Sequence, residues 1–394
     1  MGPSLARWPD SPTAGRMWHS PPVRQPSRRA FFGATAAVAV GSLTAACESD
    51  VPRETSTAIA PVPPTGRFQA GIVAPQEAQA TVLVVVADLH DGVAVGPLVA
   101  ELGKTVQALT AGADARLFGL PPGDLTVTIG IGPRLVRMAD PALPGAEDLP
   151  EFPHEQIPPS ARGGDLLLQI CASDPMIPPI AAAALLESRG LRERWRQSGH
   201  RGTTVPVEGG HTAPRNLFGF TDGIVGPRTT AQQHQNLWLP DGPATDGTIA
   251  VLRRIQLDLP RFAALPVTEQ EAVFGRRRHT SEPLSGGTIA SDPDLTAKTP
   301  DGRYRIPADA HVRRAHPAAV GVGLMLRRSY SITDPVPGLL FISFQNDIRT
   351  FTKTLTHMSN GDALLPFTTT TACATFLILP GFDDTHPLGA TVFR

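Results

Sequence analysis

RNLFGFTDG, at residues 215–223, is the stretch from which the rest of the chain is interpreted. It holds Asp222 between glycines, directly after two bulky aromatic residues. Because glycine tolerates positive φ and lets another molecule approach the main chain, Gly219 and Gly223 predict a tight turn with an uncrowded carboxylate. Apolar surroundings disfavour a charged carboxylate, which is a common way to build a general acid or base. An ordinary Asp-Gly surface turn is the alternative, and the stretch alone does not decide.

Length and charge narrow the class of protein. The chain has 394 residues with 41% hydrophobic content, enough for one large or two ordinary cores, and the length favours two units. Its 35 basic and 36 acidic residues give a formal net charge of -1, so no nucleic-acid or anionic-lipid surface is expected. The three cysteines include no CxxC pair, which excludes a structural zinc site built on thiolates. A small-molecule partner is therefore expected.

The first 66 residues are predicted to be a leader and a tether. SRRAFF at residues 27–32 is a twin-arginine signature, and the apolar run 33–46 that follows is too short to cross a bilayer. We expect export of a folded, cofactor-bearing protein to the outside of the cell or to the cell envelope, with residues 1–46 as the signal peptide. Met17 is an alternative start. Lipid anchoring at Cys47 and release after cleavage at Ala46 both remain open.

Two similar α+β halves follow the Pro/Thr/Ser-rich linker at 47–66. Strands at residues 81–87, 125–131, 165–171 and 191–197 and helices at 95–109 and 180–186 are predicted for a domain over 67–205. Strands at 249–257, 322–329, 339–345 and 373–379 and helices at 267–274 and 347–358 are predicted for a domain over 206–394. The order of elements favours two ferredoxin-like, split βαβ units whose sheets share one core, with helices outside.

Several common catalytic motifs are missing, whereas a set of haem-compatible residues is present. The sequence lacks GxGxxG opening a helix, a phosphate-binding Gly-Lys-Ser/Thr loop, HExxH and GxSxG. It does contain DAHVR at 309–313, MLRRSY at 325–330 and FISFQND at 341–347. An imidazole ligates haem iron, a carboxylate behind it makes the ring more basic, and an arginine with an acid can cleave an O–O bond.

At these segments the chain resembles the dye-decolorizing peroxidases, specifically the secreted branch that includes the deferrochelatases. The resemblance runs from about Phe68 to the C-terminus and includes GGDL at 163–166, the GxxDG stretch 219–223 and VFGR at 273–276. The family fold, two ferredoxin-like domains forming a β-barrel-like sandwich with haem in the second, agrees with the predicted order of elements.

The resemblance implies a role for each matching residue. Asp222 would be the distal acid-base, Arg327 the distal arginine, His311 the proximal iron ligand and Asp347 the partner of that histidine. The resemblance also implies haem contacts by Gly219, Phe220, Gly223, Arg327 and Phe344.

Each role has a rival among the neighbouring residues. His316 lies five residues after His311 and is the next candidate ligand. Adjacent residues of a strand face opposite ways, so only one of Arg327 and Arg328 can enter the pocket, and the motif favours Arg327. Asp347 could instead cap the helix that follows it.

The implied function is that of a haem peroxidase. One haem b per chain would react with hydrogen peroxide, and small organic donors such as dyes and phenols would return the electrons in two one-electron steps. The alternative is a deferrochelatase-like protein that binds haem and releases its iron. A homo-oligomer is compatible with either function.

Overall fold

The computed structural model describes residues 60–145, 147–188, 190–207 and 211–393. The predicted twin-arginine signature, the cleavage site and Cys47 lie outside these residues. Within the described ranges, every helix is too short or too polar to pass through a bilayer.

The N-terminal half is a four-stranded antiparallel sheet with the strand order β2-β3-β1-β4. That order and the alternation of strands with helices are those of a ferredoxin-like unit, as predicted. Its elements are β1 (Thr81–Leu89), α1 (Val95–Thr110), η1 (Ala115–Leu117), β2 (Thr126–Ile131), α2 (Pro133–Ala139), η2 (Pro159–Ala161), β3 (Leu166–Ala172), α3 (Ile177–Leu186) and β4 (Leu191–His200).

The C-terminal half repeats the same strand order, as β9-β10-β7-β11. A short hairpin, β5 (Thr204–Pro206) with β6 (Thr212–Pro214), precedes it. The elements of the C-terminal half are α4 (Thr230–Asn236), β7 (Thr248–Leu257), α5 (Leu259–Ala263), α6 (Val267–Phe274), α7 (His311–Arg314), α8 (Pro317–Val320), β8 (Leu326–Arg327), β9 (Tyr330–Ile332), β10 (Gly338–Gln345), α9 (Ile348–Ser359), η4 (Leu365–Phe367) and β11 (Thr368–Ile378).

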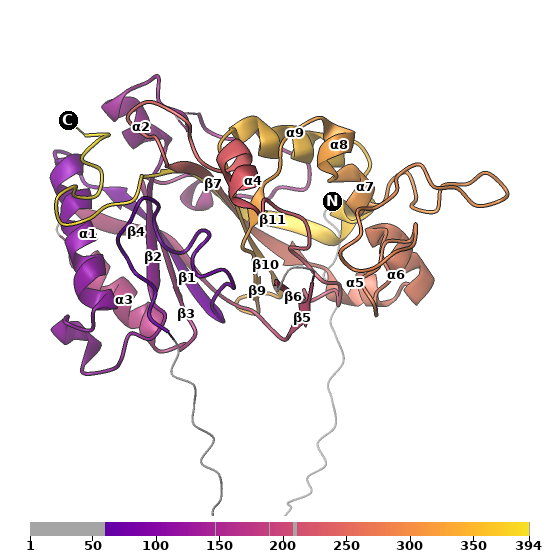
Figure 1. Ribbon diagram of the computed structural model, residues 1–394, viewed down its shortest axis with the longest axis horizontal. Helices are drawn as coiled ribbons and strands as arrows, with labels where there is room; N and C mark the ends of the chain where they lie inside the picture. Colours follow the sequence, from indigo (N-terminus) through magenta and orange to yellow (C-terminus); the bar gives the residue numbers. More distant parts are fainter. Residues whose placement is uncertain (1–59, 146, 189, 208–210, 394) are drawn as a thin grey trace, which may run out of the picture. The chain divides into compact units, whose positions relative to one another are not determined.

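The two sheets join edge to edge into one closed barrel. β11 pairs with β2 and β4 pairs with β9, while β7 pairs with β10, so a ring of eight strands has no free edge. Helices α1 and α3 cover the outer face of one half, and α7, α8 and α9 gather on the outer face of the other (Figure 1). The predicted sandwich with external helices is confirmed.

Both faces of β1 are covered, which explains why it reads as an unbroken apolar run. Val82, Val84 and Val86 face the barrel interior, whereas Leu83 and Val85 pack beneath α1 and α3. Fully burying one such side chain stabilises the fold by about 1.5–3 kcal/mol. The same alternation in β7 and β10 decides which residues can reach a cavity outside the barrel.

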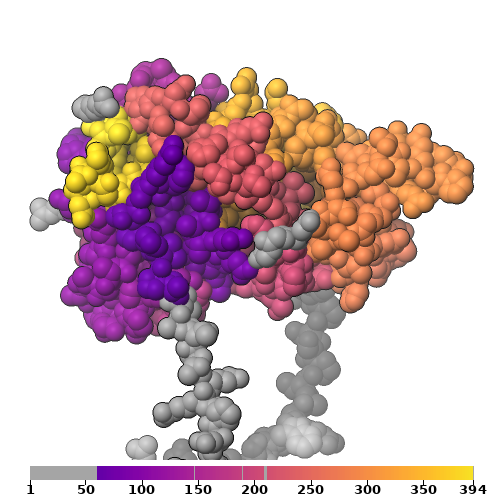
Figure 2. Space-filling model, viewed as in Figure 1, coloured from indigo at the N-terminus to yellow at the C-terminus, as the bar shows by residue number. Residues whose placement is uncertain are grey.

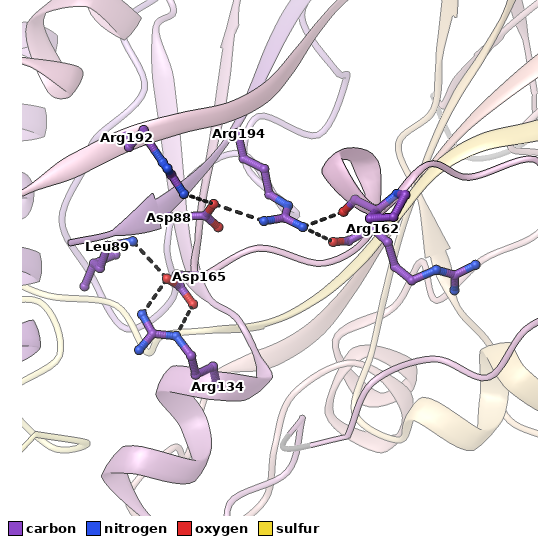
Figure 3. Close-up of polar contacts among 8 residues, drawn as sticks. Asp88, Leu89, Arg134, Arg162, Asp165, Arg192 and Arg194 are labelled. Carbon is purple, nitrogen blue, oxygen red and sulfur yellow. Dashed lines mark hydrogen bonds and ion pairs between the residues drawn. The ribbon is translucent and has the colours of Figure 1, made fainter. Parts of the chain in front are cut away.

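Charged residues of the N-terminal half are paired around two aspartates (Figure 3). Asp165 accepts two hydrogen bonds from Arg134, at 2.7 and 2.6 Å, and one from Leu89 N at 2.8 Å. Asp88 lies 3.3 Å from Arg192 and 3.0 Å from Arg194. Burial raises the pKa of Asp165, but the bonds from Arg134 and Leu89 outweigh it and hold this pKa below its ordinary value.

One predicted strand is largely wrong. Residues 322–329 were expected to form a single strand, but only Leu326–Arg327 pair with β10, and a separate β9 begins at Tyr330. Leu324 N donates to the side chain of Asn236 instead of to a strand, at 3.0 Å. The segment between α6 and α7 was not predicted to have a regular structure, and it projects from the C-terminal half (Figure 2).

Candidate active site

A cavity of about 240 Å³ lies on the outer face of the C-terminal sheet. Because side chains alternate along a strand, Arg253 and Ile255 of β7 and Phe341 of β10 face this cavity, while their neighbours face the barrel interior. The opposite walls come from α7, α9 and the loop after β6. The predicted residues that line the cavity are Asp222, Gly223, His311 and Arg327.

His311 begins α7 and is held by a buried carboxylate. Its Nδ1 lies 2.8 Å from Asp362 Oδ2, and the Asp362 side chain is fully buried whereas 31% of the His311 side chain is accessible. Burial lowers the pKa of His311, but the charge and hydrogen bond of Asp362 outweigh it, so this pKa is raised. Since Nδ1 is bound to Asp362, Nε2 is the nitrogen left to bind a metal.

The predicted role of Asp347 as partner of His311 is wrong. The Asp347 carboxylate accepts a hydrogen bond from Arg349 N at 2.8 Å as the cap of α9, and it forms an ion pair with the Arg349 side chain at 2.7 Å. Capping was the alternative that the sequence left open. Asp362 follows Gly361 in a polar turn, and nothing in the sequence distinguishes it from a surface aspartate.

The rival histidine is already engaged through both ring nitrogens. His316 Nε2 lies 3.0 Å from Asp292 Oδ1, and His316 Nδ1 accepts a hydrogen bond from Ala318 N at 3.3 Å. His316 caps α8 and lines the cavity, but it has no nitrogen left for a metal. His311 is therefore the better candidate for a metal ligand.

Asp222 is fixed by its own loop. Asp222 N donates to Pro214 O at 2.9 Å, and Gly223 N donates to Asp222 Oδ1 at 2.6 Å. Gly223 has a φ of +77°, which glycine adopts at little cost, and this turn presents the carboxylate to the cavity. The other carboxylate oxygen of Asp222, Oδ2, accepts no hydrogen bond from the described residues of this turn.

Arg327 and Arg328 face opposite ways, as predicted. Arg327 lines the cavity, and among the described residues its side chain makes one hydrogen bond, from Nη2 to Val225 O at 3.5 Å. Its Nε is buried and has no acceptor among the described residues, and no carboxylate of those residues forms an ion pair with it. Arg328 is buried on the other face, where Nη1 donates to Ile72 O and Pro75 O, both at 2.9 Å.

Three predicted cofactor contacts lie behind the cavity wall. Phe344 faces the barrel interior, and Phe341 takes its place in the cavity, as the strand alternation requires. Phe220 stacks on Phe274 with ring centroids 3.8 Å apart, so it supports the wall from behind. Gly219 lies against the side chain of Arg278. Direct contact of these three residues with a ligand in the cavity is therefore not supported.

A second cavity-lining arginine without an ion-pair partner among the described residues is Arg276, which had no role assigned from the sequence although it stands in the VFGR motif. Arg276 is only 7% exposed and donates to Ser281 O at 2.8 Å and Ile289 O at 3.2 Å. Burial, and then the charge of Arg327, lower the pKa of Arg276 to about 10. No carboxylate among the described residues forms an ion pair with Arg276. An apolar cavity with two such arginines and a free imidazole nitrogen fits haem, which combines an iron, an apolar ring and acidic substituents.

Comparisons with known proteins agree with this chemistry. The Dyp-type peroxidase N-terminal family model matches residues 69–201, and the C-terminal family model matches residues 213–383. A dye-decolorizing peroxidase of Thermobifida fusca (strain YX) is 36% identical over 251 residues, which cover 58% of each chain. A deferrochelatase of Yersinia pestis bv. Antiqua (strain Nepal516) is 29% identical over 360 residues, 82% of each chain.

The solved structures include a DyP-type peroxidase from Cellulomonas bogoriensis. It is 30% identical, with a TM-score of 0.77, and the match covers 86% of this chain and 99% of that one. The two family models match in order along the chain, and the solved structure shares its fold. The chain belongs to the Dyp-type peroxidase family.

Proposed function

We propose that this peroxidase holds haem b through His311 Nε2 and uses Asp222 and Arg327 to cleave hydrogen peroxide. The observation that carries the proposal is the presence, in one cavity, of a carboxylate-supported imidazole and an arginine without an acidic partner. When bound, the haem supplies the iron that binds peroxide and takes up its oxidising equivalents.

The protein residues would manage protons and charge. Asp222 Oδ2 would accept a proton from the inner oxygen of peroxide and pass it to the outer oxygen, which leaves as water. Oδ1 is already fixed by Gly223 N, so the carboxylate would keep its orientation during the transfer. Arg327 would stabilise the negative charge that develops on the leaving oxygen.

Asp362 would act through His311. An aspartate that accepts from Nδ1 fixes the ring orientation and makes the other nitrogen a stronger donor to iron. Small organic electron donors, such as dyes and phenols, would complete the cycle in two one-electron steps.

Turnover of an anthraquinone dye by the haem-loaded protein tests the proposal. Dye bleaching should require both peroxide and haem, and it should be lost in a variant that carries both Asp222→Asn and Arg327→Leu. Unchanged bleaching by that variant would mean that other residues cleave the peroxide.

The similarity to a deferrochelatase favours a second candidate function, which is the release of iron from haem. The haem-loaded protein would then yield free iron and intact porphyrin under reducing conditions. Porphyrin fluorescence together with an iron chelator measures this release. Iron release without dye bleaching would replace the peroxidase proposal.

We also propose export through the twin-arginine pathway, supported by Arg28 and Arg29 before the apolar run. Replacing both with lysine should retain the protein in the cytoplasm, because the pathway reads the arginine pair and not charge alone. Palmitate labelling that disappears in Cys47→Ala would favour a lipid anchor over release.

We also propose that the protein forms a homo-oligomer, and sedimentation would test this.

A further inference from the structure

A hairpin at residues 276–283, here called the clamp hairpin, starts at the cavity-lining Arg276. An isolated bridge pairs Arg276 with Pro283, and Arg277 N donates to Glu282 O at 2.7 Å. This hairpin opens the projecting segment between α6 and α7 (Figure 1). Its first residue forms part of the active-site wall, and its later residues contact the loop that carries Asp222.

Two sets of hydrogen bonds join the clamp hairpin to that loop. Arg215 donates from Nη1 to Arg278 O at 2.8 Å and from Nη2 to His279 O at 2.6 Å. The second contact joins two hydroxyl groups, Thr221 Oγ1 and Ser281 Oγ, at 2.5 Å. Thr221 is 9% exposed and Ser281 2% exposed, so water is largely excluded from the second contact. A buried hydroxyl pair is sensitive to the loss of either partner.

Ser281 occupies an unusual position in the hairpin. Its φ is +63°, in the left-handed region that glycine adopts freely and other residues adopt only at a cost. A strained residue persists where its surroundings fix it, and strained residues often lie at functional sites. The Ser281 carbonyl accepts from Arg276 Nη1 at 2.8 Å, while its hydroxyl holds Thr221. One residue therefore joins the cavity arginine to the residue directly before Asp222.

We propose that Ser281 is a positioning residue for the active site. Through its hydroxyl it fixes Thr221 and so the direction of the Asp222 carboxylate, and through its carbonyl it ties that loop to Arg276. The proposal rests on the acid-base role proposed for Asp222. Ser281 touches neither peroxide nor cofactor, and its effect is to keep Asp222 in one place before peroxide arrives.

Substitutions at the two hydroxyl residues separate positioning from backbone stability. Ser281→Gly removes the hydroxyl group but suits the positive φ, so the hairpin should keep its shape. Thr221→Val removes the other hydroxyl at nearly constant volume, and Thr221→Ser retains it. Thr280→Ala is the matched control, because among the described residues the Thr280 hydroxyl accepts one hydrogen bond, from Glu282 N at 3.5 Å.

The first readout is amide hydrogen exchange in the haem-loaded protein without peroxide. Ser281→Gly and Thr221→Val should speed exchange in residues 217–223, whereas Thr221→Ser and Thr280→Ala should leave it unchanged. Haem affinity should equal that of the parent in all four variants. Parental exchange in both Ser281→Gly and Thr221→Val would overturn the proposal.

The second readout is the rate of a single reaction with peroxide. Ser281→Gly and Thr221→Val should each be about tenfold slower, because small misplacements of a reacting group are costly. The double variant should be no slower than either single variant, since each single substitution already removes the same hydrogen bond. A double variant as slow as the product of the two single effects, or single variants with the parental rate, would contradict the proposal.

Asp222→Asn, measured in parallel, distinguishes this inference from the proposed function. If Asp222→Asn is slow while Ser281→Gly reacts at the parental rate, only the positioning role fails. If Asp222→Asn itself reacts at the parental rate, the proposed acid-base function fails, whatever the exchange data show.

Discussion

The two halves of the barrel share one strand order, but arginines beside two aspartates of the first half and two arginines on the cavity wall of the second differ in their partners. In the N-terminal half, Asp165 and Asp88 each face arginines within hydrogen-bonding distance (Figure 3). In the C-terminal half, Arg327 and Arg276 line a cavity without a carboxylate of the described residues as an ion-pair partner. Pairing stabilises the fold around Asp165 and Asp88, whereas the charges of Arg327 and Arg276 are available to a ligand or to a reaction.

The comparison also separates two aspartates that look similar in sequence. Asp165 follows two glycines and Asp222 lies between glycines, and both belong to segments that resemble the family. Asp165 is saturated by Arg134 and Leu89 N, so it holds β3, β1 and α2 together. Asp222 has one oxygen fixed and faces a cavity, so it is suited to exchange a proton. Glycine context alone therefore does not identify a catalytic carboxylate.

The largest effect is expected for loss of the proposed haem ligand. His311→Ala should weaken haem binding more than about 100-fold, because loss of a residue that only supports a metal ligand already costs about 10–100-fold. Titration of the apo-protein with haem, followed by absorbance, measures the affinity. His316→Ala is the control and should bind haem like the parent. Loss of haem from His316→Ala alone would move the ligand there.

A smaller loss of haem affinity is expected when Asp362 is neutralised. Asp362→Asn should weaken binding by about 10–100-fold, since an amide supports the imidazole less well than a carboxylate. Asp347→Asn should bind haem with the affinity of the parent, because Asp347 caps α9. The reverse pattern in the same titration would restore the role first assigned to Asp347.

The paired aspartate of the N-terminal half should affect stability and not reactivity. Asp165→Asn should lower the free energy of unfolding by about 2 kcal/mol, because charge-assisted hydrogen bonds to Arg134 and Leu89 are weakened. Arg134 is partly exposed, so solvent screening keeps the effect below that of a fully buried pair. Chemical unfolding measures the loss, while the peroxide rate should remain parental.

Acid should progressively remove the contribution of Asp165 to the free energy of unfolding, which is the smallest of these effects. The folded-state pKa of Asp165 is lowered, so its contribution to stability is present above the unfolded pKa of about 4 and is lost as pH falls through the folded value. The stability difference between the parent and Asp165→Asn should therefore be constant near neutral pH and shrink below about pH 4. A difference that grows in acid would mean that the folded-state pKa is raised instead.

The sequence was sufficient for the fold and for part of the site. Apolar strands such as β1 and β7 and the helix α1 are visible because both faces of a buried strand, or one face of a helix, must be apolar. The strand alternation predicted that only one of Arg327 and Arg328 would enter the cavity, and the family motif selected Arg327. Asp222 and His311 were found through short motifs, and both line it.

The remaining site residues depend on long-range packing that no local pattern records. Asp362 meets His311 across 51 positions, and Ser281 meets Thr221 across 60. Phe344 was wrongly predicted to contact the cofactor because the alternation of side chains was not applied along β10. Phe341 faces the cavity, and Phe344 lies on the opposite side of the strand. The predicted strand began too early because Leu324 N bonds to the side chain of Asn236 and not to a strand, which an apolar run does not reveal.

The central claim is that an unpaired arginine in the cavity does chemical work, whereas a paired arginine stabilises the fold. The most direct test of this claim mixes the haem-loaded protein with equimolar peroxide and measures the rate of the reaction by stopped-flow absorbance. Arg327→Leu should react about 100-fold more slowly, as expected for the loss of one charge-stabilising donor, while Arg134→Leu should react at the parental rate. A parental rate for Arg327→Leu, or equal slowing by Arg134→Leu, would contradict the claim.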